Sequence, residues 1–527
     1  MEFNIFINKG LKALLMLGFF GHSMSLLGLG TLPQDSTAKA PRVQILKADV
    51  ILRDMVDPDI QRLVGGVKLQ FKEVLLSCDS AWRFDDGRFK TMGRVQMQDK
   101  SNALSADVME VDPTMQSTIA WSKKPSLVIM KGEIGESQSP VLFYDMAEKS
   151  LLYEQGGTLT QKGTRIAFQV GRWIEVNSLL MLGGEVSIDD GKERIHSDSL
   201  HLLRSEESIQ FLGESVVLSA DSSLELHCSR GLYQSASRSG WFGGDGYDKA
   251  AWIRQEGVLL QGDSLVLPSD SLAPREAWGH VVVLDSQENW QLEGAHAKQL
   301  MNAMTSEVDA SILVGDKETP ARLMDTSGKD TLFLVADTLQ LRPELIRAWP
   351  KVQLEQGSSM ATCDTLIWSE LDSLIQLNKD PLLWMEGQFL RADSVTVHLV
   401  ENTLDRLHAW GHVGLMYPAG DSCYQQIAGR DLQGIFREGK LKTIDVSGNA
   451  ELVYFNTDTI EASCDEFNRS ACSRLRIEME EGVAETITLL DDPSGLWTSA
   501  AAVEAEPSIE SLVWKDPPPP IYRRINH

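Results

Sequence analysis

Basic residues are scarce in this chain relative to acidic ones. Lys and Arg number 49 against 75 Asp and Glu, so the formal net charge is -26 over 527 residues. Such a surface repels nucleic acid and offers no basic patch for anionic lipid headgroups, which argues against either as a docking partner. An anionic lipid would therefore have to be held mainly through its apolar part.

Long apolar runs are missing after the first forty residues. Within residues 1–40, Lys9 and Lys12 precede the short apolar run Ala13–Phe20, a pattern typical of an export signal or an N-terminal anchor. No Cys follows this run, so no lipoprotein anchor is expected, and whether the segment is cleaved stays open. The remaining composition, 43% hydrophobic and 24% charged, indicates a large globular core.

Signatures of catalytic and metal sites are sparse. His408 and His412 have the spacing of a helical zinc motif, but in the strand expected there the two lie about 13 Å apart. The stretch Gly240–Gly246 resembles a phosphate-binding loop, yet it lacks the Lys-Ser/Thr that should follow. No Gly-x-Ser-x-Gly elbow or Ser-His-Asp order stands out. We therefore expect no catalytic residue, no metal and no cofactor.

Cysteines are few, and most of them do not suggest disulfides. Four of the six occupy one recurring slot beside a polar residue: Cys78, Cys228, Cys363 and Cys464. In other copies the slot holds Ala, Gly or Ser, as at Ala106 and Gly262. A slot with these occupants favours a small buried side chain over a disulfide. Cys423 and Cys472 lie outside the slot and remain unassigned.

A repeated phrase is what the chain has in abundance. Ala409–Val413 reads AWGHV and is identical to Ala277–Val281, while Ala348–Val352 is a degraded copy. Each copy is preceded by a tripeptide that consists of a small residue, Asp, and Ser or Thr. This tripeptide is more frequent than the phrase itself, and its Asp residues at positions 337, 364 and 393 are 27 and 29 residues apart. A unit of fixed type with turns of variable length is typical of a stacked repeat fold.

Alternation within the unit predicts two strands joined by a turn. The apolar residues of one face are Val395, Val397, Leu399, Val413 and Leu415, and polar residues take the other face. The Gly of the second strand implies a bulge or a close backbone approach at a corner. We expect the Asp to close that corner by accepting backbone N–H groups. Helical patterns are almost absent from residues 43–498, with 341–348 as the main exception.

These units resemble the OstA-like superfamily, which includes LptA, LptC and the N-terminal domain of LptD. The resemblance covers residues 43–500 and is carried by Arg62–Leu69, Leu75–Trp82, Met92–Val95 and Arg391–Ser394. It implies an all-β fold, an OstA-like β-jellyroll of stacked antiparallel strands in two sheets with an open apolar groove, extended or in tandem. We expect jellyroll regions at 41–300 and 301–500 and a Pro-rich tail at 501–527.

The resemblance also implies a function. It is that of a non-enzymatic periplasmic bridge or chaperone that carries lipopolysaccharide toward the outer membrane, with the lipid A acyl chains in the groove. The implied partners are lipopolysaccharide and LptC-like and LptD-like jellyrolls joined through edge strands, together with head-to-tail self-association. The groove candidates are Val395, Val397, Leu399, Val413 and Leu415, and packing in a closed core is the alternative for each.

Two other interpretations stay open. One is a structural or adhesive exported β-repeat protein with a closed core and no lipid. The other is a carbohydrate-active β-helix enzyme, which needs a local cluster of carboxylates on one sheet face. The regular recurrence of the Asp residues favours corners over such a cluster. An open apolar groove would separate the lipid carrier from the structural protein.

Overall fold

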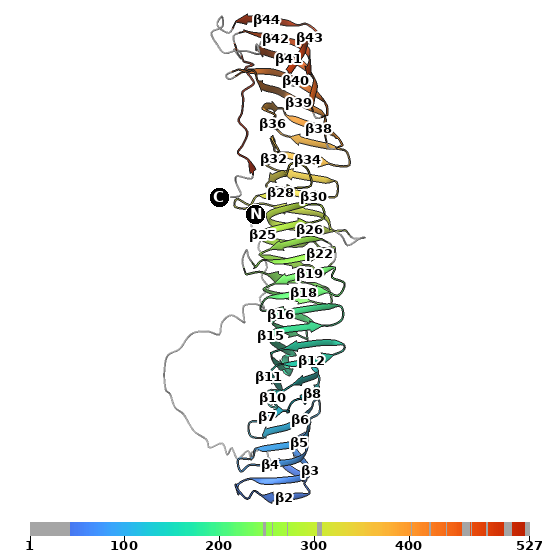
Figure 1. Ribbon diagram of the computed structural model, residues 1–527, viewed down its shortest axis with the longest axis vertical. Helices are drawn as coiled ribbons and strands as arrows, with labels where there is room; N and C mark the ends of the chain where they lie inside the picture. Colours follow the sequence, from blue (N-terminus) through green and yellow to red (C-terminus); the bar gives the residue numbers. More distant parts are fainter. Residues whose placement is uncertain are drawn as a thin grey trace, which may run out of the picture.

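The chain forms a long column of antiparallel strands (Figure 1). The computed structural model describes residues 43–245, 249–255, 257–270, 272–302, 308–401, 403–420, 423–438, 440–455, 464, 466–480, 483–499 and 508–521. The export signal or anchor predicted over residues 1–40 lies outside these ranges. In the described part of the chain, no helix reaches the length and apolarity that a bilayer-spanning helix requires.

The chain runs back and forth across the column. Each such crossing consists of one long strand or two short strands, and it bends at a corner that divides it into two arms. Some strands pass the corner without interruption: β3 (Gln61–Phe71), β4 (Val74–Arg83), β5 (Phe89–Gln98), β6 (Ala103–Asp112), β15 (Leu179–Asp189), β16 (Glu193–Leu203), β25 (Arg275–Asp285), β26 (Trp290–Met301), β39 (Thr403–Pro418), β40 (Tyr424–Arg437), β41 (Lys440–Phe455) and β42 (Glu466–Glu480). Their ladders contain bulges at the corner, as between Trp410 and Val413. A bulge bends a strand and increases its twist.

In the other crossings the corner separates two short strands. These pairs are β1 (Gln44–Lys47) and β2 (Val50–Arg53), β7 (Ser117–Trp121) and β8 (Val128–Gly132), β9 (Gly135–Ser139) and β10 (Val141–Asp145), β11 (Ser150–Tyr153) and β12 (Gly157–Gln161), β13 (Thr164–Phe168) and β14 (Val170–Ile174), β17 (Ser208–Phe211) and β18 (Ser215–Ser219), β19 (Leu224–Cys228) and β20 (Arg230–Gln234), β21 (Ser239–Gly243) and β22 (Ala251–Gln255), β23 (Val258–Gly262) and β24 (Ser264–Leu267), β27 (Val308–Val314) and β28 (Ala321–Asp325), β29 (Leu332–Ala336) and β30 (Thr338–Arg342), β31 (Leu345–Trp349) and β32 (Val352–Gln356), β33 (Ser359–Cys363) and β34 (Thr365–Ser369), β35 (Leu374–Asn378) and β36 (Leu382–Met385), β37 (Gln388–Arg391) and β38 (Ser394–Val400), and β43 (Val483–Leu490) and β44 (Ser494–Ser499).

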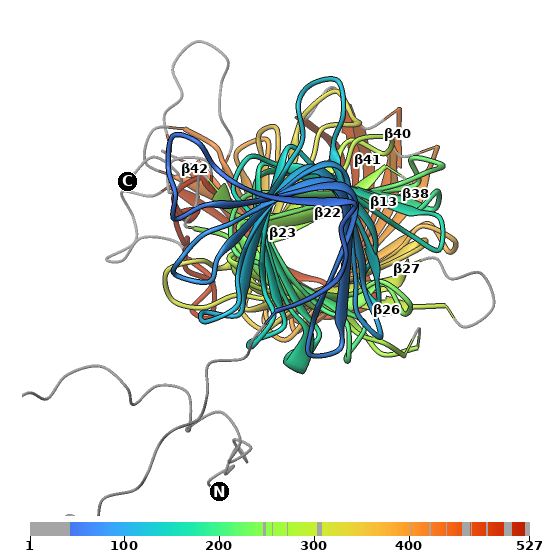
Figure 2. The ribbon, with the colours of Figure 1, turned by 90° about the horizontal axis from the view of Figure 1, so that it is seen from below.

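Hairpin turns join consecutive crossings alternately at the ends of the two arms. Arm A is the arm whose turns include residues 99–102 and 162–163, and arm B is the arm whose turns include 84–88 and 175–178, where the short 3₁₀ helix η1 (Glu175–Asn177) lies. Each crossing pairs with its neighbours in the sequence, so the column grows by stacking. The predicted all-β fold of stacked antiparallel strands is confirmed, and its two layers are the arms of one continuous sheet. The crossings overlie one another down the long axis (Figure 2).

A single cluster of buried side chains fills the space between the arms from Leu63 to Met479. Its members come from alternate positions along each strand, as expected where one face of a sheet is buried. The pairing continues through the expected region boundary near residue 300, because β26 pairs with β25 on one side and with β27 and β28 on the other. The division into two jellyroll regions remains a prediction.

The strands of the repeated phrase follow the predicted alternation in β39. Leu407, Ala409 and Val413 are buried, whereas Trp410 and His412 are exposed. The helical exception expected at 341–348 is wrong, because these residues belong to β30, its hairpin turn and β31. Pairing with neighbouring strands overrides the local helical tendency there.

The corner Asp residues pair with basic side chains that follow the corner on the next strand. The pairs are Asp79–Arg94 at 2.7 Å, Asp263–His280 at 3.0 Å, Asp337–Lys351 at 2.8 Å, Asp364–Lys379 at 2.7 Å and Asp393–His412 at 3.0 Å. The hydrogen bond from Arg94 lowers the pKa of Asp79, and that from Lys379 lowers the pKa of Asp364. The predicted bond from a backbone N–H to the carboxylate is therefore wrong at these corners. It holds at Asp107, which accepts the Lys123 N–H at 2.8 Å.

The corner glycine is required by the approach of this carboxylate. At Gly411 the backbone φ is +73°, and a Cβ placed there would lie 2.7 Å from Cγ of Asp393. Gly93 stands in the same relation to Asp79, with φ at +80°. The bulge inferred from the recurring Gly is confirmed, whereas the neighbour that approaches closely is the Asp side chain and not a backbone segment.

The recurring position that holds Cys, Ala, Gly or Ser is buried, as predicted, at most of the cysteines that occupy it. Cys78, Cys228 and Cys363 are buried free thiols, and burial raises the pKa of Cys78 to about 11 and that of Cys363 to about 12. The prediction is wrong at Cys464, which forms a disulfide with Cys423. Sequence could not reveal this pair, because the two residues are 41 positions apart and are brought together only by stacked hairpins.

Candidate functional site

Four of the five predicted groove residues lie in the interior between the arms. Val395, Val413 and Leu415 are buried members of the main cluster, and Val397 packs against it. Leu399 is half-buried, and a bulge after His398 shifts its pairing to Leu404. At these crossings side chains fill the interior. Lipid contact by these five residues stays a prediction.

Leu415 also lines a small apolar cavity between the arms. The cavity measures about 30 Å³, room for one or two water-sized groups only. Its other walls include Leu383, Leu390, Leu407, Leu432, Phe436 and Leu441. The interior at the repeated phrase is therefore almost closed.

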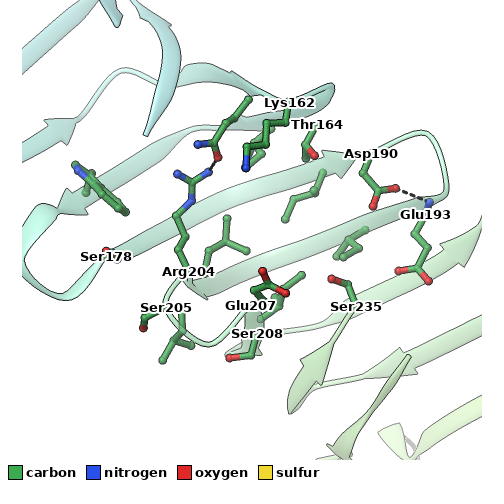
Figure 3. A pocket seen from close by; sticks show the side chains of 18 of the residues that line it. Lys162, Thr164, Ser178, Asp190, Glu193, Arg204, Ser205, Glu207, Ser208 and Ser235 are labelled. Atoms are coloured by element: carbon green, nitrogen blue, oxygen red, sulfur yellow. Dashed lines mark hydrogen bonds between the residues drawn. The ribbon is translucent and has the colours of Figure 1, made fainter. Parts of the chain in front are cut away.

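A much larger cavity of about 530 Å³ opens between the ends of the arms at residues 133–235 (Figure 3). Its apolar floor is contributed by both arms: Ile166, Ile188 and Ile195 from arm A, and Trp173, Leu202 and Ile209 from arm B. Its rim is charged and includes Lys162, Asp190, Arg204 and Glu207. We call this space cavity 1. An apolar floor with a polar rim suits an amphipathic molecule whose polar end stays in water.

Arg204 spans the mouth of cavity 1 from arm B to arm A. Its guanidinium donates to the carbonyl oxygen of Ile134 at 3.2 Å and to the Gln161 side chain. It also lies 5.7 Å from the ring centroid of Trp173. Burial lowers the pKa of Arg204. This side chain both narrows the opening and places a positive charge at the rim.

A buried carboxylate forms a second bridge between the arms. Glu193, only 5% exposed, begins β16 in arm A and also lines cavity 1. It accepts a hydrogen bond of 2.8 Å from the Tyr233 hydroxyl and one of 2.9 Å from Nε of Arg238, both from arm B. Burial raises the pKa of Tyr233. Because the charge of Glu193 is paired by Arg238, its burial is tolerated.

A second cavity, cavity 2, measures about 500 Å³ and repeats this arrangement higher in the column. Trp290 and Leu323 from arm A and Leu341 and Ile346 from arm B form its apolar walls, and Asp325 lies at its edge. Cavities 1 and 2 thus lie on the same open side, between the arm ends, with buried core in the crossings that separate them.

Features considered for other chemistry have structural roles. His408 forms a hydrogen bond of 2.8 Å with Asp431, and His412 forms one with Asp393. The two imidazole rings therefore contact different Asp residues and do not share a ligand site. Within the described ranges, no group of three or more His, Cys, Asp or Glu side chains is placed to hold a metal ion. The glycine-rich stretch begins in β21, and residues 246–248 lie outside the described ranges.

The two ends of the column present apolar edge strands. In β2, Ile51 and Leu52 are 55% and 53% exposed, and in β44, Leu496 and Trp497 are 65% and 50% exposed. An edge strand with exposed apolar side chains can receive a strand from another chain.

Comparison with known proteins supports the resemblance for the first part of the chain. Residues 40–198 match the model of the OstA-like protein family. This region is OstA-like. Among solved structures, the chain is similar to LptH from Pseudomonas aeruginosa, described as the LptA-homologous periplasmic component of its lipopolysaccharide transport device. That match has 16% identity, covers 23% of this chain and 81% of LptH, and has a TM-score of 0.20. No curated protein matches the chain.

The OstA-like region runs from β1 into β16, so cavity 1 straddles its end. Of the cavity's floor, Trp173 lies inside the region and Ile209 beyond it. Sequence reasoning missed both cavities and the bridging residues Arg204 and Glu193. The sequence gives little sign of Arg204 and Glu193, because charged residues are common beside hairpin turns. Only the stacking of the strands brings these two side chains opposite the other arm.

Proposed function

We propose that this protein is a non-enzymatic periplasmic carrier of lipopolysaccharide, which holds the acyl chains of lipid A between the arms of its β-column. The observation that carries the proposal is the pair of cavities with apolar floors and charged rims, on the open side of a column whose first part is OstA-like. The column provides shelter for acyl chains, and the proposal assigns no bond-making step to it.

The energetic need for such shelter is large. Burial of apolar groups is worth about 0.8 kcal/mol per CH₂, so exposing one 14-carbon chain to water costs on the order of 10 kcal/mol. A lipid with several chains cannot cross an aqueous compartment unaided. Near-equal apolar sites stacked along one column would allow it to move in steps of small free-energy difference.

The charged rim fits the polar part of such a lipid. The rim of cavity 1 carries carboxylates, including Asp190 and Glu207, as well as Lys162 and Arg204. In the proposal the phosphate groups lie at these two basic side chains while acyl chains reach toward the apolar floor. The bridge of Arg204 to arm A has to open for a chain to pass, so entry of lipid is coupled to loss of the Arg204–Gln161 hydrogen bond.

The exposed edge strands supply the joining surfaces of the proposal. LptC-like and LptD-like jellyrolls, or further copies of this chain, would pair with β2 at one end and β44 at the other. A continuous stack of this kind would connect the inner and outer membranes and place the protein in the periplasm, with residues 1–40 as its export signal or anchor.

A structural β-repeat protein is the competing function. It is favoured by the filled interior around Val395 and Val413, where the main cluster leaves little free volume. Such a protein would keep the arms closed at all crossings and bind no lipid.

Analysis of the lipid that copurifies with the full chain from a lipopolysaccharide-producing cell distinguishes the lipid carrier from the structural protein. We expect bound lipid A species by mass spectrometry, and at least a severalfold loss in Leu202→Trp and Ile346→Trp, which fill cavities 1 and 2. The matched controls His201→Trp and Arg347→Trp alter the neighbouring residue, which lines neither cavity, and should leave lipid unchanged. Absence of lipid from the folded wild-type chain would favour the structural protein.

A further inference from the structure

The Pro-rich tail returns along the outside of the column instead of extending from its end. Residues 508–521 run from the level of β40 back to the level of β32 (Figure 1). Ile509, Leu512 and Ile521 are 2%, 4% and 2% exposed. The described part of the tail is therefore packed at both of its ends, and it contains no α-helix or β-strand.

The outer face of arm A beneath the tail is apolar. Its buried side chains are Trp384, Phe389, Met416, Val453, Phe455 and Phe467, and they form a cluster of their own with the tail. Most strands here bury two consecutive residues, such as Leu415 toward the interior and Met416 toward the tail. Adjacent buried residues mean that both faces of a strand are covered. These crossings thus need a cover on the outside.

Side chains of the tail enter specific places on this face. Leu512 lies over Gly414, where a Cβ would overlap its Cδ1 atom. Trp514 stacks on Tyr424 with ring centroids 4.9 Å apart and contacts Phe389 at 5.6 Å. Aromatic contacts of this kind add to the burial of apolar area.

Polar side chains of the column hold the backbone of the tail. Gln426 accepts the Ile509 N–H at 2.8 Å, and the Trp384 indole donates to the Lys515 carbonyl oxygen at 2.7 Å. Further along, the Gln353 amide donates to the Pro519 carbonyl oxygen at 3.2 Å, and Glu355 accepts the Ile521 N–H at 2.8 Å. Apolar anchor sites combined with side-chain bonds to an extended backbone characterise peptide-binding grooves, including those that take Pro-rich segments.

We propose that this outer face is a peptide-binding groove, that the tail is its tethered ligand, and that the same segment of a second copy can replace it. This inference goes beyond lipid carriage and does not depend on it. A tether raises the effective concentration of a ligand to the millimolar range. The groove is therefore filled by its own tail at low protein concentration, and exchange between copies links two columns when that tail is displaced.

A labelled synthetic peptide of residues 508–521 tests the proposal by fluorescence anisotropy. The full chain with Leu512→Ala and Trp514→Ala loosens its own tail, and we expect it to bind the peptide at least about tenfold more tightly than the wild-type chain. The full chain with Val513→Ala is the matched control, because Val513 is 67% exposed, and it should behave as wild type. A peptide carrying the same two alanines should not bind.

Two outcomes would overturn the proposal. One is a loosened chain that keeps its β-sheet circular dichroism yet binds no peptide, since the tail would then belong to the core. The other is unchanged binding after Gly414→Leu is added, because a side chain there occupies the place of Leu512 and would block the groove. If the double variant does not fold, Ile521→Ala, which removes only the last anchor, takes its place in the same assay.

Discussion

The corner at Gly411 allows the fold's main local rule to be tested quantitatively. Gly411→Ala forces an alanine to adopt a φ of +73° and directs its Cβ at the carboxyl group of Asp393. The left-handed backbone costs roughly 1–2 kcal/mol for a residue with a Cβ. The carboxylate must also move, which breaks its 3.0 Å bond to His412; an exposed pair of this kind contributes at most about 1 kcal/mol. The expected loss is about 1–3 kcal/mol.

A double-mutant cycle separates the two causes. Asp393→Ala alone removes an exposed pair and should cost at most about 1 kcal/mol. With Asp393→Ala in place, Gly411→Ala no longer meets a carboxylate and should add only the roughly 1–2 kcal/mol of the left-handed backbone, so the double variant should cost no more than Gly411→Ala alone and less than the sum of the single changes.

Native-state hydrogen exchange of the amides in β38 and β39 is the appropriate assay, because a stacked repeat does not unfold as one unit. Strictly additive single and double effects would refute the explanation that the glycine exists to admit the Asp carboxylate. An unchanged exchange rate in Gly411→Ala would refute the backbone argument as well.

Three further predictions concern different levels of the fold. Asp79 has a lowered pKa, so the stability that its bond to Arg94 provides is present at neutral pH and is lost as the pH falls through that pKa; the stability difference between wild type and Arg94→Met, followed by urea unfolding, should disappear in acid. Cys423→Ser opens a 41-residue loop and should destabilise the C-terminal crossings by up to about 4 kcal/mol in guanidinium titrations, with no further effect of reductant. Phe242→Ala, at a fully buried position, should cost about 3–5 kcal/mol by hydrogen exchange, whereas the adjacent and exposed Trp241→Ala should cost below about 1 kcal/mol.

The local parts of the fold were accessible to sequence reasoning. Period-two alternation predicted the buried Val413 and the exposed His412, because one face of each strand meets the core. The recurrent Gly predicted a tight corner, since only a close neighbour or a left-handed backbone requires it. Both inferences depend on residues close together in the chain.

The candidate sites depend on register between distant residues and were missed for that reason. Residues from different hairpins form the Cys423–Cys464 disulfide, the Glu193–Tyr233 hydrogen bond and the walls of the cavities. Their contacts depend on how the hairpins stack, which in turn depends on the lengths of the turns. The basic partners of most corner Asp residues, such as Lys351 for Asp337, were also missed, because each becomes a neighbour of its Asp only across the ladder. The prolines of the tail indicate a break in regular secondary structure, but they give no sign that Ile509 and Leu512 are buried against the column.

Site-specific photocrosslinking in cells is the measurement that tests the lipid-carrier account most directly. The crosslinker would replace Leu202 in cavity 1 and Ile346 in cavity 2, with the neighbouring residues His201 and Arg347 as matched controls. The account predicts lipopolysaccharide adducts at Leu202 and Ile346 and none at the controls. Folded protein without adducts at Leu202 and Ile346 would contradict it and leave a closed structural column.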